Sequence, residues 1–144
     1  MNTIKQICAF MENRPGQLAD LLSILSKNNI NLRALNVAET SDYGILRIIT
    51  DDSEGAEKCL AAEGFIVSVN PVFAIAVDDK PGGLNELLDK LAGDGVDIEY
   101  MYSIFRYEAG KAYMIISAKN MDVMAQSLEK HNIESASNET FSIK

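Results

Sequence analysis

The sequence predicts an α+β fold made of two similar units, and three observations support this prediction. The stretch ENRPGQLADLL at residues 12–22 returns as DDKPGGLNELL at residues 78–88, so the pattern recurs after 66 positions. Apolar, β-branched runs alternate with segments in which leucine recurs at the spacing of one helix face. These segments follow the same order in both halves. The identical pairs at this displacement are Pro15 and Pro81, Gly16 and Gly82, Leu18 and Leu84, Leu21 and Leu87, Leu22 and Leu88, and Leu25 and Leu91.

The first repeat is expected to contain four strands and two helices. The leucines after the ENRPGQ turn form one helix face. SDYG at 41–44 supplies the Asp and Gly of a hairpin turn, and the second helix opens with capping residues and stops at Gly64. The expected strands are 3–11, 30–40, 45–50 and 65–69, and the helices are the stripe from Leu18 to Leu25 and residues 51–64.

The second repeat follows the same plan. Its leucine stripe runs from Leu84 to Leu91, and EAG at 108–110 is expected to turn between its second and third strands. The other expected elements are strands at 72–77, 96–107 and 111–118, a helix at 120–132, and a last strand within 133–144.

Each repeat is therefore predicted to be a βαββαβ unit of the ferredoxin-like type, with both helices on one face of an antiparallel sheet. The units are expected to span residues 1–70 and 71–144, because only VNP separates them. In this plan the second strand lies on a sheet edge, and exposed edges tend to pair. We expect the two sheets to lie side by side, joined through their second strands into eight strands.

Composition excludes several function classes. A formal net charge of −8, with no basic cluster, argues against nucleic-acid binding. The longest apolar run, VFAIAV, is too short to cross a membrane, and the N-terminus lacks the apolar core of a signal peptide, so the cytoplasm is the expected location. An RNA-recognition fold has the same topology, but its aromatic signature is missing.

No catalytic, metal or cofactor site is indicated by the residue pattern. Cys8 and Cys59 have no metal-ligand spacing and are expected to be buried free thiols, and His131 is the only histidine. No Ser-His-Asp or Walker-type arrangement is present. We therefore expect a non-enzymatic protein without a cofactor.

The Pro-Gly turns are the strongest candidates for a binding site. A turn that enters a helix points backbone N–H groups outward at the positive end of the helix dipole. Glycine removes the side chain that would block a ligand, so such a turn can hold a carboxylate. The alternative is a tight turn with no ligand.

These turns resemble the opening of an ACT domain, a small-molecule regulatory module of amino-acid biosynthetic enzymes. MENRPGQLADLLSILSKNNINLRAL at 11–35 is similar to the module of phosphoglycerate dehydrogenases, and VDDKPGGLNELLDKLAGDGVDIEYM at 77–101 resembles the same module. The resemblance covers essentially the whole chain. It implies a tandem ACT protein that binds a free amino acid between modules.

The resemblance also implies the residues of the site. The loop position is Asn13 in repeat one and Asp79 in repeat two, and the second-strand position is Asn31 and Asp97. Pairing within the chain would combine Asn13 with Asp97 and Asp79 with Asn31. Backbone N–H groups of the turn would take the carboxylate, and Asp would accept from the ammonium group. The full set of expected ligand-binding residues is Met11, Asn13, Arg14, Gly16, Gln17, Leu18, Asn31, Asp79, Gly82, Gly83, Leu84 and Asp97.

Some of these residues have an alternative role. Asn and Asp also favour turns and helix caps, and Arg14 and Lys80 are equally well explained as solvated loop charges. Met11 stands where the dehydrogenase-like motif has His, so the resemblance does not specify serine as the ligand.

Two functions follow from the sequence. The first is a non-catalytic amino-acid sensor that acts through a homodimer or through an enzyme or regulator partner. The alternative is an interaction subunit of a biosynthetic enzyme, with no ligand of its own, whose sheet edges pair with another regulatory module.

Overall fold

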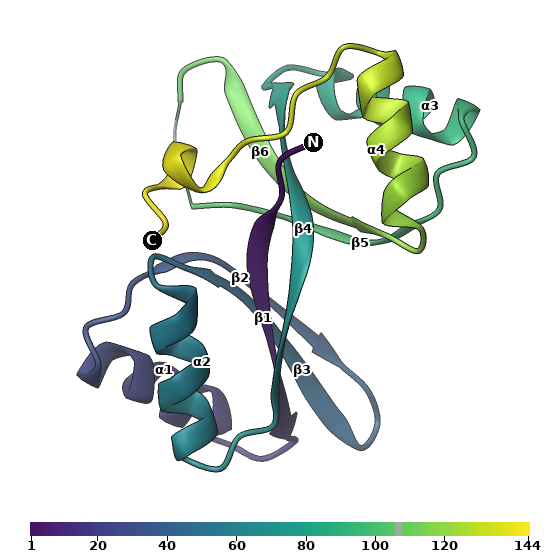
Figure 1. The fold of residues 1–144 in the computed structure, drawn as a ribbon. Helices are drawn as coiled ribbons and strands as arrows, with labels where there is room; N and C mark the ends of the chain where they lie inside the picture. The colour runs from purple at the N-terminus through teal and green to yellow at the C-terminus, as the bar shows by residue number, and fades with distance from the viewer. Residues whose placement is uncertain (106–107) are drawn as a thin grey trace. The chain divides into compact units, whose positions relative to one another are not determined.

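The computed structural model describes residues 1–105 and 108–144, so the predicted end of the second strand at 106–107 lies outside the described residues. Helices and strands alternate in the order shown in Figure 1. Their bounds are β1 (Ile4–Glu12), α1 (Gln17–Lys27), β2 (Leu32–Glu39), β3 (Tyr43–Thr50), α2 (Ser53–Ala62), β4 (Val67–Asp78), α3 (Gly83–Gly93), β5 (Ile98–Ser103), β6 (Lys111–Ala118), α4 (Met121–Lys130) and the 3-10 helix η1 (Asn138–Phe141).

The chain forms two compact units, and each contains a terminal segment from the far end of the chain. The repeat-one unit consists of Lys5–Pro71 with Glu139–Lys144, and the repeat-two unit of Val72–Asn138 with Met1–Ile4. These units follow spatial contacts rather than the sequence repeat, and the division at residues 70 and 71 stays a prediction.

The sheet of each unit has an antiparallel core. In the repeat-one unit β3 pairs with β1 and with β2, and Ile48 lies opposite Ile7 and Leu35. In the repeat-two unit β6 pairs with β4 and β5, and Ile116 lies opposite Phe73 and Met101. The mixed α+β fold with antiparallel strands is confirmed.

The predicted joining of the two sheets through their second strands is wrong. The strand order is β2-β3-β1-β4-β6-β5, a six-stranded sheet in which β2 and β5 stand at the ends. The reason is that β4 runs without interruption from Val67 to Asp78, so the last strand of repeat one and the first strand of repeat two are one strand. Pro71, which was expected to mark a linker, lies within β4 and has the extended backbone that proline allows.

The predicted last strand of repeat two is also wrong. After α4 the chain makes one isolated bridge, between Ser135 and Ile75, and then the 3-10 helix η1. The segment SASNET has low strand propensity, because small and polar side chains pack poorly on a pleated surface. The terminal residues instead pack against the repeat-one unit, where Phe141 and Ile143 are buried.

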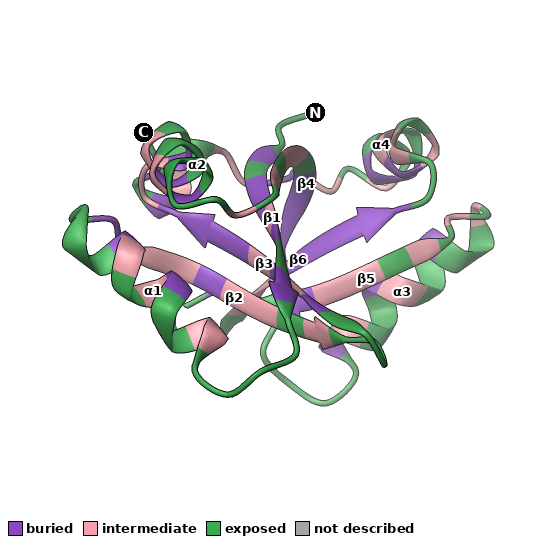
Figure 2. Cartoon of the chain, turned by 90° about the horizontal axis from the view of Figure 1, so that it is seen from below, coloured by how far each residue is buried: buried purple, intermediate pink, exposed green. Residues whose placement is uncertain are grey.

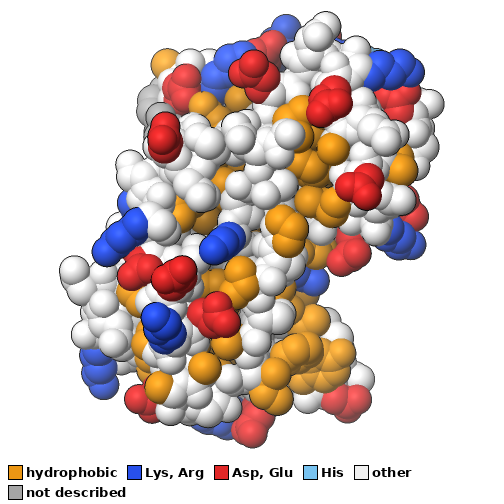
Figure 3. Space-filling model, viewed as in Figure 1, with side chains coloured by type: hydrophobic (Ala, Val, Ile, Leu, Met, Phe, Trp, Pro, Cys, Tyr) orange, Lys and Arg blue, Asp and Glu red, His pale blue; other side chains and the backbone are white. Residues whose placement is uncertain are grey.

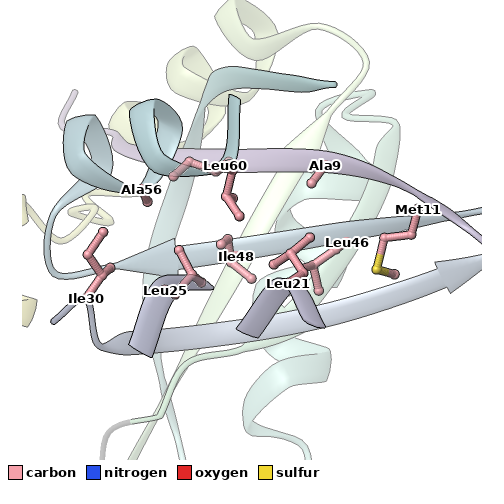
Figure 4. Close-up of a cluster of buried hydrophobic side chains, with 10 residues drawn as sticks. Ala9, Met11, Leu21, Leu25, Ile30, Leu46, Ile48, Ala56 and Leu60 are labelled. Atoms are coloured by element: carbon pink, nitrogen blue, oxygen red, sulfur yellow. The ribbon is translucent and has the colours of Figure 1, made fainter. Parts of the chain in front are cut away.

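The leucine stripes form the cores, as predicted. In the repeat-one unit Leu21 and Leu25 of α1 pack with Ile48 of β3 and Leu60 of α2 (Figure 4). In Figure 2 the central strands β3 and β6 are largely buried, whereas each helix has one exposed side. Each fully buried leucine stabilises the fold by about 1.5–3 kcal/mol. The core of the repeat-two unit is formed by Phe73, Ile75, Val77, Leu87, Leu91, Ile116, Ala118, Met124 and Leu128.

Arg33 on β2 holds the C-terminal segment against the repeat-one unit. Its Nε donates to the carbonyl oxygen of Phe141 at 2.7 Å, and its Nη2 donates to that of Ser142 at 3.2 Å. The backbone N–H of Lys144 donates to the carbonyl oxygen of Asp51 at 2.9 Å. The segment is therefore fixed by hydrogen bonds as well as by apolar burial.

Both cysteines are free, as predicted, but each is only half-buried. Burial raises the pKa of the Cys8 and Cys59 thiols. Of the helices in the described part of the chain, none has the length and apolar character needed to span a bilayer.

Candidate functional site

The two Pro-Gly turns have the same backbone geometry. Gly16 and Gly82 both have φ of 84°, in the left-handed region that glycine adopts at little cost. Each glycine is immediately followed by a helix, α1 or α3. The sequence therefore builds the same strand–turn–helix junction twice.

The helices that start at these turns lack the side-chain caps that the other two helices have. Asp52 caps α2 by accepting from the N–H of Gly55, and Asn120 caps α4 by accepting from Asp122 and Val123. Within the described residues, no side-chain cap hydrogen bond is made at the start of α1 or α3. Because uncapped helix starts present N–H donors and a positive dipole end, these two sites suit a carboxylate.

A cavity of about 300 Å³ opens at the turn of repeat one. The structure brings together five of the sequence-predicted site residues around it, and adds two carboxylates from Glu12 and Glu39. The predicted residues that line it are Met11, Asn13, Arg14, Gln17 and Leu18, beside Pro15.

The polar groups of this cavity differ in whether they already have hydrogen-bond or ion-pair partners within the protein. Asn13 donates from Nδ2 to the backbone oxygen of Thr40 at 2.9 Å, so its amide nitrogen holds the β2–β3 hairpin. Arg14 forms ion pairs with Glu12 at 3.6 Å and Asp20 at 3.4 Å. Gln17 Oε1 is buried and has no hydrogen-bond partner among the described residues. A buried acceptor without a partner is costly, and a ligand that donates to it would remove that cost.

The turn of repeat two has no space for a side chain at the corresponding position. Gly83 replaces Gln17, and a Cβ added at Gly83 would overlap the backbone carbonyl oxygen of Asp78. The Asp78 carboxylate accepts from Lys111 Nζ at 2.6 Å and lies 3.9 Å from Lys80 Nζ. The Lys111 ammonium lowers the pKa of Asp78, which in turn raises the pKa of Lys111. Asp79 is exposed and its backbone N–H donates to the oxygen of Gly110 at 3.0 Å.

The second-strand residues lie one position before their strands. The N–H of Asn31 donates to Asp51 Oδ1 at 2.9 Å, and Asn31 lines a separate cavity of about 510 Å³. The carboxylate of Asp97 lies 3.2 Å from Lys119 Nζ. Asn13 and Asn31 therefore line different cavities of the repeat-one unit. The intrachain second-strand pairing that would have joined Asn13 with Asp97, and Asp79 with Asn31, is absent from the strand order.

Comparison with known proteins identifies the family. A family model described as ACT domain pair matches residues 2–142. The chain belongs to the ACT domain pair family. This ACT pair is similar to protein BT0572 from Bacteroides thetaiotaomicron, with 36% identity, 97% of this chain and 96% of that chain covered, and a TM-score of 0.88.

Two further solved structures share the fold of this ACT pair. The ligand-free regulatory subunit of aspartate kinase from Thermus thermophilus is 16% identical, with 88% and 90% of the two chains covered and a TM-score of 0.62. The corresponding subunit from Thermus flavus is 14% identical, with 90% and 93% covered and a TM-score of 0.57. No curated protein matches the chain.

The cavity of the ACT pair contains two acidic residues that sequence reasoning missed. Glu12 had a usable signal, because its counterpart in the other repeat, Asp78, is also acidic. No sequence signal indicated Glu39, because its position beside the turn depends on the register of strands β1, β2 and β3. It lies opposite Gly44 on β3, and Gly44 lies opposite Met11 on β1.

Proposed function

We propose that this ACT pair is a non-catalytic regulatory protein that binds a free amino acid at the Pro-Gly turn of repeat one. One observation carries the proposal. The cavity at this turn combines an uncapped helix start with a buried, unpartnered acceptor, Gln17 Oε1. A zwitterion is the ligand class that matches a donor-rich end and an acceptor in one small cavity.

The roles follow from the chemistry of each group. The N–H groups at the start of α1, around Gly16 to Leu18, receive the ligand carboxylate. Gln17 Oε1 accepts from the ammonium group, and the carboxylate of Glu39 adds favourable charge. Arg14 is already paired on one side with Asp20, so it orients the carboxylate end rather than binding it alone. The apolar side chain of Met11 forms part of the wall.

A neighbouring module supplies the remaining contact. β2 and β5 stand at the ends of the strand order, where each can pair with a strand of another chain. We propose that this other chain is a second copy, whose Asn31 or Asp97 makes the contact, or a partner enzyme, which supplies a second-strand residue of its own. The turn of repeat two, with Asp79, Gly82, Gly83 and Leu84, is proposed as the weaker site because Gly83 offers no side-chain acceptor like that of Gln17.

The second candidate function is an interaction subunit that binds no ligand. The end positions of β2 and β5 favour it, since a strand at a sheet edge can pair with another chain. The regulatory-subunit names of the Thermus proteins that share the fold are compatible with both functions.

Thermal shift with each of the twenty amino acids at millimolar concentration tests the proposal. A ligand that binds only the native state stabilises it by about 2.7 kcal/mol at 100 times its Kd, so the melting temperature should rise with dose for at least one amino acid. Gln17→Ala, which removes the acceptor, should abolish this rise.

Gln126→Ala is the matched control, since it makes the same substitution at an exposed position of α4 in the repeat-two unit. This variant should keep the response of the wild-type protein. No shift with any amino acid, or an equal shift in Gln17→Ala and wild type, would refute ligand binding at this turn and favour the interaction subunit.

A further inference from the structure

An apolar surface is exposed on the repeat-one unit beside a cavity of about 540 Å³. Phe10, Tyr43 and Ile66 line this cavity and are 44%, 42% and 70% exposed. We call these three residues the Phe10 surface. Figure 3 shows hydrophobic side chains gathered on the outside of the molecule. Large apolar side chains that cluster in the open mark an interaction site more often than scattered ones do.

Internal contacts hold these residues together. The rings of Phe10 and Tyr43 have centroids 5.7 Å apart and are tilted by 53°. The backbone N–H of Phe10 donates to the carbonyl oxygen of Ile66 at 3.0 Å. The surface is thus built on paired strands and on the connection between α2 and β4, which makes it a preformed platform.

The equivalent positions in repeat two show that the fold does not require apolar residues here. Phe10 corresponds to Ala76 at the 66-residue displacement. Tyr43 lies opposite Glu12, as Lys111 lies opposite Asp78. Ile66 and Glu134 each stand two positions after the left-handed residue that follows a helix, Gly64 or Asn132. The same three places are small or charged in repeat two.

The rim of the cavity is acidic. Four carboxylates, from Glu12, Asp20, Asp42 and Glu63, face one guanidinium, from Arg14, which leaves a net charge of −3. Arg14 is itself paired with Glu12 and Asp20. A surface of this kind attracts a partner with positive charge and repels anionic ones.

We propose that the Phe10 surface binds a peptide segment of a partner protein that presents an aromatic or branched aliphatic side chain next to Lys or Arg. The apolar side chain enters the cavity between Phe10 and Tyr43, and the basic residue pairs with the acidic rim. A second copy of this chain is disfavoured at this surface, because the rim carries a net charge of −3 and the whole chain a net charge of −8. Ile66 is too exposed to form the wall of an enclosed small-molecule pocket. A ligand that contacts this side chain therefore has to extend over the surface.

This cavity shares Met11, Glu12, Arg14 and Gln17 with the cavity of the proposed amino-acid site, so peptide binding is tested without any amino acid ligand. Random peptides displayed on phage are selected on the immobilised wild-type protein, and the enriched sequences are synthesised with a fluorescent label. The selected sequences should combine an apolar residue with neighbouring Lys or Arg. Fluorescence anisotropy should show that binding weakens about tenfold or more when sodium chloride is raised from about 50 to about 500 mM.

The variants transfer the residues of repeat two onto repeat one. Phe10→Ala, Tyr43→Lys and Ile66→Glu together should weaken peptide binding about tenfold or more, because truncating buried anchors removes most of an interface's affinity. Ile66→Gln alone tests the same point without a change of charge, and folding should be unaffected because the position is 70% exposed.

The matched control is Phe105→Ala, which removes an aromatic side chain of 62% exposure from the other unit and should leave binding unchanged. Failure to enrich a common sequence would overturn the proposal. So would peptides that bind Ile66→Gln as tightly as wild type, or that lose affinity equally in Phe105→Ala.

Discussion

The two Pro-Gly turns have the same backbone conformation at their glycines and differ mainly in the residue that follows the glycine. Gly16 and Gly82 share φ of 84°, and both turns lead into uncapped helices. The next residue is Gln17 in one turn and Gly83 in the other. Gln17 lines an open cavity, whereas the backbone of Asp78 fills the corresponding space at Gly83. A duplicated motif can thus keep its backbone conformation in both copies while the space beside the first helical residue differs.

The largest expected effect comes from placing the repeat-one side chain in the repeat-two turn. Gly83→Gln puts a Cβ onto the carbonyl oxygen of Asp78, so the backbone has to move. We expect a loss of about 3 kcal/mol in the free energy of unfolding, the upper range for overpacked sites. Urea denaturation of the variant and wild type would measure it.

Gly93→Ala is the control, because no atom lies within 4 Å of the added Cβ. This helical position should gain up to about 1 kcal/mol from the better helix former. A Gly83→Gln protein as stable as wild type would show that the repeat-two turn is as adaptable as the first.

An intermediate and equal effect is expected at the two left-handed glycines. Gly16→Ala and Gly82→Ala each force an L side chain to positive φ, at a cost of about 1–2 kcal/mol. Neither Cβ meets a neighbour within 4 Å, so backbone strain is the whole effect. Paired urea titrations should give equal losses, and a clear inequality would contradict the common geometry of the turns.

The smallest effect concerns the helix ends that follow the turns. Asp94 ends α3 and accepts from Lys130 Nζ at 2.5 Å, Ser127 Oγ at 2.7 Å and His131 Nε2 at 2.8 Å. Its counterpart at the end of α1 is Asn28, which has no carboxyl group. The hydrogen bond from Lys130 is the main cause that lowers the pKa of Asp94, followed by that from Ser127.

Because the folded pKa lies below the unfolded value, the carboxylate stabilises the protein above about pH 4 and this contribution is lost as the pH falls. Asp94→Asn should therefore have a melting temperature that falls less than that of wild type when the pH decreases from about 5 to about 2. Asp97→Asn, at a pair with both partners exposed, serves as the control. Parallel pH profiles for Asp94→Asn and wild type would rule out this role.

Local patterns were sufficient to predict the helices and the turns. The leucine stripes placed Leu21, Leu25, Leu87 and Leu91 in the cores, and the second helix was expected to open with capping residues, of which Asp52 makes the cap. Each of these predictions depends on residues within one or two helical turns of each other, where spacing alone determines which side chains meet.

Long-range features were not predictable in the same way. Pro71 suggested a break, yet extended backbone suits proline and β4 passes through it. The destination of the C-terminal segment depends on Arg33, which is more than one hundred residues earlier in the chain. In repeat two the backbone carbonyl oxygen of Asp78 lies where a side chain at Gly83 would begin. The two motifs are nearly identical in sequence, so they do not reveal this difference.

The exchanged terminal segments have a consequence for the order of events during synthesis. Repeat one is translated before repeat two, yet its unit includes Glu139–Lys144, which are translated after the strands and helices of repeat two. Domains usually complete their folding in the order of translation. The repeat-one unit therefore lacks part of its residues until repeat two has been translated, while the Met1–Ile4 segment lacks the sheet of its own unit over the same interval. We expect neither unit to complete its folding before residues 139–144 have been translated.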